Sequence, residues 1–285
     1  MKYSLSLVWI ACLLIAVGCN GPKNAAPEDA MGALTLKTYD PVSVFVLEEH
    51  HPAAARFSVI DMHSHAYRND EAGIRQWAKT LDENNIEKVI VLTKAFGEEF
   101  DRLYDLFTGI SDKFELWCGF DMTKWDQPEF PECAVKELER CFAKGAGGVV
   151  DSFVECVERH PNTTFIACHL LNINHDYARL GKILDSHPNL WIDISARHQE
   201  TCVTPRATRR FYEKYQDRIL FGTDNDPDPS MYHAQWRILE TEDEHFYLDE
   251  QSYHWPMQGI GLSDEVLRKI YHDNAVRLLS ARKIK

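Results

Sequence analysis

The sequence contains no C-x-x-C pair, although it has 8 cysteines among 285 residues. Such pairs are typical of structural zinc knuckles, so we expect no site of that class. The sequence also lacks an excess of basic residues: 31 Lys and Arg stand against 44 Asp and Glu, giving a formal net charge of −13. A surface this acidic repels phosphate backbones, so we expect no nucleic-acid partner.

No apolar run is long enough to span a bilayer comfortably. The run nearest the N-terminus, Leu5–Gly18, follows Lys2 and ends in "AVGCN" just before Cys19. This pattern resembles a bacterial lipoprotein signal that is cut before a cysteine that then carries lipid. We therefore expect an exported protein, anchored in the membrane by lipid on Cys19 and facing the periplasm or the cell surface. The alternative is an uncleaved N-terminal anchor helix.

Three segments are expected along the chain. Residues 1–19 are the lipoprotein-type signal peptide, 20–55 a tether with a lead-in, and 56–285 the folded domain. The tether is rich in Pro, Ala, Gly and Asn up to about Asp40 and has no apolar periodicity. After it, "DPVSVFVLEEHH" is compatible with a short lead-in strand. No solenoid-type repeat occurs.

From Arg56 onward, short apolar runs alternate with segments of helical periodicity. The runs are "SVIDMHSH", "KVIVLT", "FELWCGFD", "GAGGVV", "TTFIACHL", "LWIDIS" and "ILFGTD". Continuous apolar strands are buried on both faces, as in a parallel sheet. The sequence therefore predicts an α/β fold, an incomplete TIM-like (β/α) barrel of about seven core strands.

The first run carries two histidines, one residue apart. Because side chains alternate along a strand, Asp61, His63 and His65 share one face. At the carboxyl end of a barrel strand, two imidazoles so placed can share a cation. The alternative is a pair of hydrogen-bonded surface histidines.

Two other strand ends carry candidate residues. Asp224 ends the last apolar run, "ILFGTD", and buried carboxylates are rare unless paired or metal-bound. First and last strands are neighbours in a closed barrel, so Asp224 can meet His63 and His65. His169 ends "TTFIACHL" and is a candidate ligand or general acid/base. The alternatives are a helix cap for Asp224 and a structural histidine.

The motifs "VIDMHSH", "HPNTTFIACHL", "PNLWIDISAR", "YQDRILFGTD" and "NAVRLL" together resemble the amidohydrolase-related family (amidohydrolase 2) of metal-dependent β/α-barrel hydrolases. The likeness runs from about Val59 to Leu279. It implies a divalent cation, zinc by preference, held by His63, His65 and Asp224, with His169 beside it. The family also includes decarboxylases of aromatic acids, so the resemblance does not fix the reaction.

One family element is missing. The family's fifth strand supplies another metal-binding histidine, but here about a dozen residues join Val150 to Thr163, enough for a crossover helix and no extra strand. Three explanations stay open: His169, Asp151 or a water fills that ligand position, the lead-in supplies an extra strand, or the chain is a shortened, inactive relative. We also expect the strands "GAGGVV" and "TTFIACHL" to lie side by side or splayed, with His169 displaced toward the metal.

Two further segments lie at the expected barrel mouth. Arg197 and His198 follow "LWIDIS" and are candidate contacts for an anionic substrate; alternatively, Arg197 pairs with a carboxylate such as Asp193. The stretch from Asn225 to about Ile260 is rich in Tyr, Trp, His and Pro. We expect a long loop there, shaping a pocket or simply packing over the barrel.

The leading hypothesis is thus a metal-dependent hydrolase of a small molecule's C–N or C–O bond. In it Asp224 takes a proton from the attacking water, and His169 orients or protonates the substrate. The alternatives are a non-catalytic binding lipoprotein on a degraded barrel and a metal-dependent decarboxylase.

Overall fold

The computed structural model describes residues 35, 39–123, 126–147, 154–248 and 254–281. The chain divides into two compact units, Met1–Asp40 and Pro41–Lys285, and the account below concerns the second. The predicted signal peptide, Cys19 and most of the tether lie outside the described residues. Among the helices that are described, none combines the length and the apolar character needed to cross a membrane.

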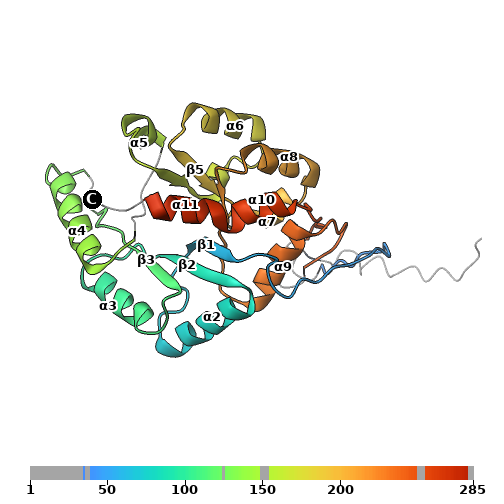
Figure 1. Ribbon diagram of the computed structural model, residues 1–285, viewed down its shortest axis with the longest axis horizontal. Coiled ribbons are helices and arrows are strands. Elements are labelled where there is room, and N and C mark those ends of the chain that lie inside the picture. Colours follow the sequence, from blue (N-terminus) through green and yellow to red (C-terminus); the bar gives the residue numbers. More distant parts are fainter. Residues whose placement is uncertain (1–34, 36–38, 124–125, 148–153, 249–253, 282–285) are drawn as a thin grey trace, which may run out of the picture. The chain divides into compact units, whose positions relative to one another are not determined.

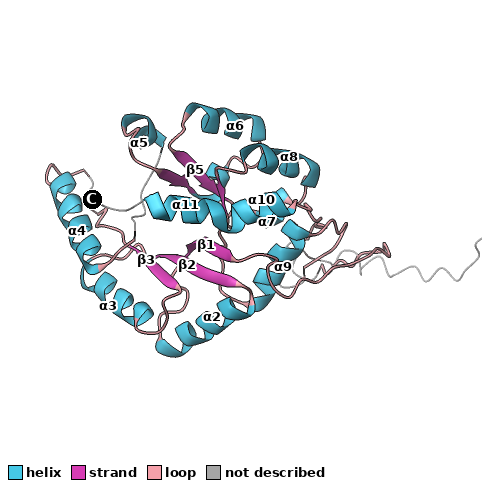
Figure 2. Cartoon of the chain, viewed as in Figure 1, coloured by secondary structure: helices cyan, strands magenta, loops and turns pink. Residues whose placement is uncertain are grey.

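Strands and helices alternate along the second unit, so the predicted α/β fold is confirmed (Figures 1 and 2). The strands are β1 (Val59–Ser64), β2 (Ile86–Leu92), β3 (Phe114–Trp117), β4 (Phe165–Ala167), β5 (Leu190–Asp193) and β6 (Ile219–Leu220). The α-helices are α2 (Glu71–Glu83), α3 (Gly97–Thr108), α4 (Phe130–Lys144), α5 (Val154–Arg159), α6 (Tyr177–Ser186), α7 (His198–Thr201), α8 (Pro205–Tyr215), α9 (Pro229–Glu240), α10 (Asp264–Arg268) and α11 (Asn274–Ala281). A 3₁₀ turn, η1 (Cys168–Asn172), follows β4, and a π turn, η3 (Lys269–Asp273), joins α10 to α11.

All strand pairs are parallel, in the orders β1-β2-β3 and β4-β5-β6. Backbone hydrogen bonds join the two groups. The Met62 N–H donates to the Phe221 carbonyl (3.0 Å), and the Thr223 N–H donates to the His63 carbonyl (3.1 Å). The chain after β6 therefore lies along β1, and the strands follow one another in the order β3-β2-β1-β6-β5-β4. First and last strands are neighbours, as predicted.

The second half of the seventh predicted strand, Gly145–Val150, lies outside the described residues. Its described part ends at Gly147, whose N–H donates to the Leu116 carbonyl of β3 (2.9 Å). From Val154 to Thr163 the chain forms α5 and no strand, as the short interval predicts. Whether the seventh strand pairs with β4 stays a prediction.

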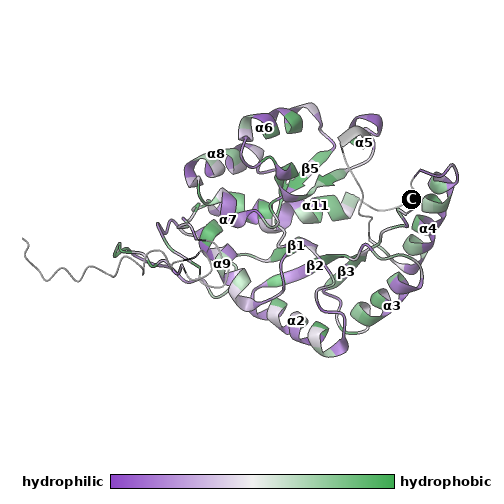
Figure 3. Ribbon diagram, turned by 180° about the vertical axis from the view of Figure 1, so that it is seen from behind, coloured by the Kyte–Doolittle hydropathy of each residue, from purple (hydrophilic) through white to green (hydrophobic). Residues whose placement is uncertain are grey.

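Helices cover both faces of the strands, which explains why the apolar runs are continuous. Ile60 and Met62 of β1 pack in one cluster with Ala275 and Leu278 of α11. Their neighbour Val59 belongs to the larger cluster that contains Trp77 of α2 and residues of the other helices. Figure 3 shows the result, with hydrophobic strands inside and hydrophilic stripes on the helices.

The expected long loop after β6 contains a helix, α9, so that prediction was wrong in part. The Asp228 side chain accepts a hydrogen bond from the Ser230 N–H, and Pro229 occupies the first turn, a combination that starts helices. Tyr232 and Trp236 are buried, and Trp236 stacks on Phe221 at 5.2 Å between ring centroids. These aromatic residues pack in the core.

The lead-in forms no strand among its described residues. It is held by side chains instead: the N–H and Nδ1 of His50 lie 2.8 and 2.6 Å from the two carboxylate oxygens of Asp243. Arg237 also donates to Asp243, at 2.8 Å. The predicted lead-in strand is therefore wrong, because this segment meets side chains after α9 rather than a strand edge.

The "NAVRLL" motif anchors α11. The Nδ2 of Asn274, which is 3% exposed, donates to the carbonyls of Gln216 (2.6 Å) and Ile219 (2.8 Å). We expect Asn274→Asp to lower the free energy of unfolding by about 1–3 kcal/mol, because an acceptor then faces two carbonyl oxygens. Urea unfolding measures this. The exposed Asn162→Asp is the matched control, and equal losses in both variants would contradict the anchoring role.

Candidate metal centre

Four strand ends converge on the site. His63 lies in β1 and His65 just after it, His169 follows β4, Asp193 ends β5, and Asp224 lies beyond β6. Because the strands are parallel, their carboxyl ends meet at one edge. The structure thus brings together all four residues predicted to surround a metal: His63, His65, His169 and Asp224.

The Asp224 carboxylate lies at the centre of this group. Its Oδ1 is 3.2 Å from His65 Nε2 and 3.8 Å from His63 Nε2, and its Oδ2 is 3.5 Å from His169 Nε2. Three imidazole rings therefore present the same nitrogen to one carboxylate.

The Nδ1 atoms of His65 and His169, on the other side of each ring, already form hydrogen bonds. His65 Nδ1 lies 2.6 Å from the Leu92 carbonyl oxygen, and His169 Nδ1 lies 2.9 Å from the Ser195 carbonyl oxygen. Since a carbonyl oxygen only accepts, each Nδ1 carries the hydrogen. In the neutral ring the Nε2 lone pair then faces the Asp224 carboxylate, an arrangement that a cation stabilises.

The donor set fits a divalent cation. His63, His65 and Asp224 each offer a ligand atom within 4.8 Å of the others. Ligands of a tetrahedral zinc ion, bound at 2.0–2.1 Å, are about 3.4 Å apart. The separations of 3.2 and 3.8 Å around Asp224 Oδ1 bracket that value.

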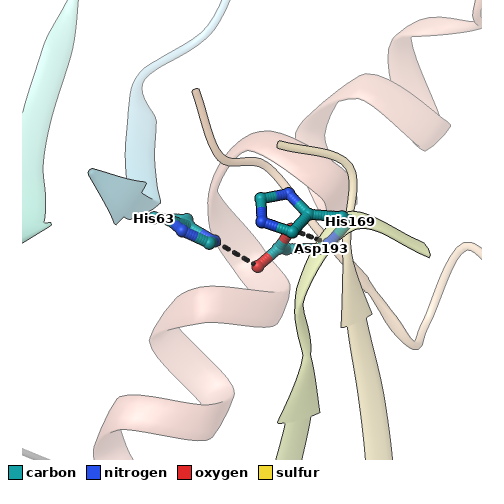
Figure 4. Close-up of side chains that lie close together, drawn as sticks. All are labelled: His63, His169 and Asp193. Carbon is teal, nitrogen blue, oxygen red and sulfur yellow. Dashed lines mark hydrogen bonds and ion pairs between the residues drawn. The ribbon is translucent and has the colours of Figure 1, made fainter. Parts of the chain in front are cut away.

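A second group that could hold a cation consists of His63, His169 and Asp193 (Figure 4). It shares only His63 with the first group. His63 Nδ1 is 3.0 Å from Asp193 Oδ2, and the His169 backbone N–H donates to Asp193 Oδ1 (2.9 Å). Asp193 is therefore already an acceptor for both histidines.

In the absence of a cation, the charges and hydrogen bonds of the site favour the ionised forms of His63, Asp193 and Asp224. Burial opposes the charged form of His63, but the charge of Asp193 and the hydrogen bond to it raise the pKa of His63 to about 11. Against burial, the same pairing lowers the pKa of Asp193 to about 2. Burial also opposes ionisation of Asp224, yet hydrogen bonds from His65 and Tyr67 hold the pKa of its carboxyl well below the usual range. A cation at this place competes with the Nε2 proton of His63.

Backbone strain gathers around the site. His169, Leu170, Leu171 and Asn172 form a left-handed turn with φ between 52° and 59°, and Asp224 has φ 49°. None of these residues is glycine, so each is held there by surrounding contacts. Such clustering is typical of functional sites.

The predicted substrate contact through His198 receives no support from the structure. The side chain is 1% exposed, with Nε2 3.1 Å from the Gly222 carbonyl oxygen, and burial lowers its pKa to about 4. His198 begins α7, which packs the ring inward near Phe221 rather than at the mouth.

Arg197 does not pair with Asp193, so that alternative was wrong. Its guanidinium donates to the Ala196 carbonyl and to the side-chain oxygen of Asn172, and lies 3.8 Å from Glu200. The side chain is 25% exposed beside the left-handed turn. Its role in substrate binding stays a prediction.

Sequence reasoning missed three residues of the site. Tyr67 donates its hydroxyl hydrogen to Asp224 Oδ1 (2.7 Å), and Asp193 and Ser195 contact both His63 and His169. Alternation along "LWIDIS", the signal that paired His63 with His65, places Asp193 and Ser195 on one face as well. Asp151, an alternative ligand, lies outside the described residues.

Comparison with protein families identifies a match. Residues 149–280 match the amidohydrolase family (Amidohydro_2). Over this region the chain is similar to the amidohydrolase family. The resemblance inferred from the motifs is thus confirmed. The matched region includes His169 and Asp224, whereas His63 and His65 precede it and reach the site through the fold.

The chain is similar to an uncharacterised TIM-barrel protein from Bordetella bronchiseptica, with 11% identity, a TM-score of 0.49, and coverage of 79% of this chain and 99% of that one. It is also similar to an amidohydrolase from Burkholderia multivorans with bound zinc, with 12% identity, a TM-score of 0.48, and coverage of 78% and 99%. No curated protein matches it.

The first-strand histidines should be required for metal binding. We expect the unaltered protein to purify with a divalent cation and the double variant His63→Ala/His65→Ala to purify without it, because two of the three candidate ligands are lost. Inductively coupled plasma mass spectrometry measures the content. The exposed pair His160→Ala/His175→Ala is the control. Unchanged metal in the first double variant would place the site elsewhere.

Proposed function

We propose that the protein is a metal-dependent hydrolase acting on a C–N or C–O bond of a small molecule. One observation carries the proposal: three imidazole Nε2 atoms face the carboxylate of Asp224, while Nδ1 of His65 and of His169 is bonded to a carbonyl oxygen. The family match over residues 149–280 agrees with a hydrolase.

His63, His65 and Asp224 would hold the cation. Imidazole and carboxylate donors in this number suit zinc. Bound there, the ion supplies Lewis-acid polarisation of a carbonyl and lowers the pKa of water.

The protein's own groups then handle the proton. Asp224 Oδ1 accepts the hydroxyl hydrogen of Tyr67, which leaves Oδ2, on the His169 side, as the basic oxygen. His169 Nε2 lies 3.5 Å from that oxygen. Asp224 Oδ2 therefore takes the proton of the attacking water and hands it to the lone pair of His169 Nε2, which passes it to the leaving group.

The reaction class is tested with His169→Ala. On a panel of lactones, amides and aromatic acids, we expect hydrolysis by the unaltered protein and a loss of about 10²–10⁴-fold in kcat/KM for the variant. Its zinc content should stay unchanged, and the exposed His175→Ala is the control.

Other outcomes distinguish the alternatives. Release of CO₂ from the aromatic acids would identify a decarboxylase, and zinc binding without turnover would identify a binding protein. Loss of zinc in His169→Ala would make His169 a ligand rather than the acid.

We also propose that the mature protein is exported and anchored by lipid on Cys19, a proposal supported by the "AVGCN" pattern alone. Mass spectrometry of the N-terminal peptide from a membrane fraction should give a diacylglyceryl Cys19. The control Cys19→Ala should remain unprocessed. An N-terminus at Met1, or a secreted form lacking Cys19, would contradict the anchor.

A further inference from the structure

Asp193 uses both carboxylate oxygens as acceptors. Oδ2 accepts from His63 Nδ1 (3.0 Å). Oδ1 accepts from the backbone N–H of His169 (2.9 Å), the backbone N–H of Ser195 (3.1 Å) and the Ser195 hydroxyl. The residue is 1% exposed, so solvent does not compete for these bonds. Figure 4 shows the carboxylate between the two histidines.

Ser195 completes the arrangement. Its hydroxyl oxygen lies 3.0 Å from His63 Nδ1 and 3.1 Å from His169 Nδ1 while its hydrogen is donated to Asp193. Both rings therefore find acceptors on their Nδ1 side, which leaves each Nε2 directed at Asp224.

The same bonds argue against Asp193 as a metal ligand, although it forms a candidate group with His63 and His169. A carboxylate offers about four lone-pair sites. Three donors already occupy Oδ1 of Asp193, which leaves that oxygen no lone pair for an ion, and Oδ2 accepts from His63 Nδ1. Asp224 is 19% exposed and therefore more accessible to an entering ion.

We propose that Asp193, assisted by Ser195, is a positioning residue that holds His63 as a metal ligand and His169 as its neighbour. It fixes the His63 ring through Nδ1 and the His169 backbone through its N–H, at the start of the left-handed turn. The proposal rests on the proposed function for the presence of a cation, but the contacts to Asp193 exist without one.

Asparagine cannot reproduce this arrangement. Its amide has one acceptor oxygen and one NH₂ group. If the oxygen faces His63, the NH₂ meets the N–H groups of His169 and Ser195; if it faces them, the NH₂ meets His63 Nδ1–H. Either orientation sets a donor against a donor.

The experiment measures the zinc Kd of the full chain by competition with a chromophoric chelator. We expect Asp193→Asn to weaken binding about 10–100-fold and Ser195→Ala about 3–10-fold. The exposed Asp112→Asn is the control and should match the unaltered protein. Wild-type affinity in both test variants would overturn the proposal.

Two NMR readouts separate positioning from general destabilisation. Long-range ¹H–¹⁵N spectra of zinc-loaded, ¹⁵N-histidine-labelled protein should show hydrogen on Nδ1 of His63 and His169, and Asp193→Asn should lose this state at His63. In metal-free protein, the His169 amide should exchange at least about tenfold faster in Asp193→Asn than in the control. Zinc bound through Nδ1 of His63 would overturn the proposal.

Failure of the proposed function and failure of the positioning role give different results. If the unaltered protein binds no zinc, the proposed function fails, and the His169 amide exchange alone decides the positioning role. A fall from two bound zinc ions to one in Asp193→Asn would make Asp193 a ligand and overturn the proposal. If Asp193→Asn does not fold, the zinc Kd of Ser195→Ala decides.

Discussion

The site depends on one contact, the buried carboxylate of Asp61 holding the chain after β6 against β1. Asp61 is fully buried and accepts from the Thr223 hydroxyl (2.6 Å), the Thr223 N–H (3.1 Å) and the His63 N–H (3.0 Å). Burial raises its pKa to about 7 despite these hydrogen bonds. A buried acid is costly in a core. Its three donors come from the two segments that must meet, and the next residue, Asp224, donates its N–H to the His63 carbonyl (2.8 Å).

The second constraint is the left-handed turn after β4. Each non-glycine residue in that conformation costs roughly 1–2 kcal/mol. Two contacts offset the cost: Leu170 is fully buried in the main core cluster, and Asp193 accepts the His169 N–H. The turn after β4 is thus held in place by the packing of Leu170 in the core and by the hydrogen bond from the His169 N–H to Asp193 at the end of β5. His169 consequently reaches Asp224 from the opposite side to His65.

Much of the fold and of the candidate site was predictable from the sequence, because the carboxyl ends of parallel strands lie at the same edge of a sheet. That rule alone places His63, His65, His169 and Asp224 together, and the continuous apolar runs give six strands in the correct places. Support from neighbouring residues is harder to predict. The alternation of side chains along β5 could have identified Asp193 as a site residue. Its hydrogen bond from the His169 N–H, however, depends on the left-handed turn. The sequence "CHLLN" does not predict that turn, because it contains no glycine. The loop expected after β6 contains the helix α9, and its aromatic residues pack inward, which was one of the two alternatives. His198 was expected at the barrel mouth, but its side chain is buried.

The positions of the side chains separate His169 from the three candidate ligands His63, His65 and Asp224. Catalytic zinc keeps three protein ligands and an open position, while four protein ligands close a structural site. Here His63, His65 and Asp224 form one compact group, and His169 joins only the group that contains Asp193. His65 meets Oδ1 of Asp224 and His169 meets Oδ2, so the carboxylate stands between these two rings. The proposed cation, if bound by this group, would have three protein ligands, and Oδ2 of Asp224 would then be the oxygen that faces His169. The family's missing fifth-strand histidine is therefore not needed for the minimum ligand count, because the first strand and Asp224 already supply it.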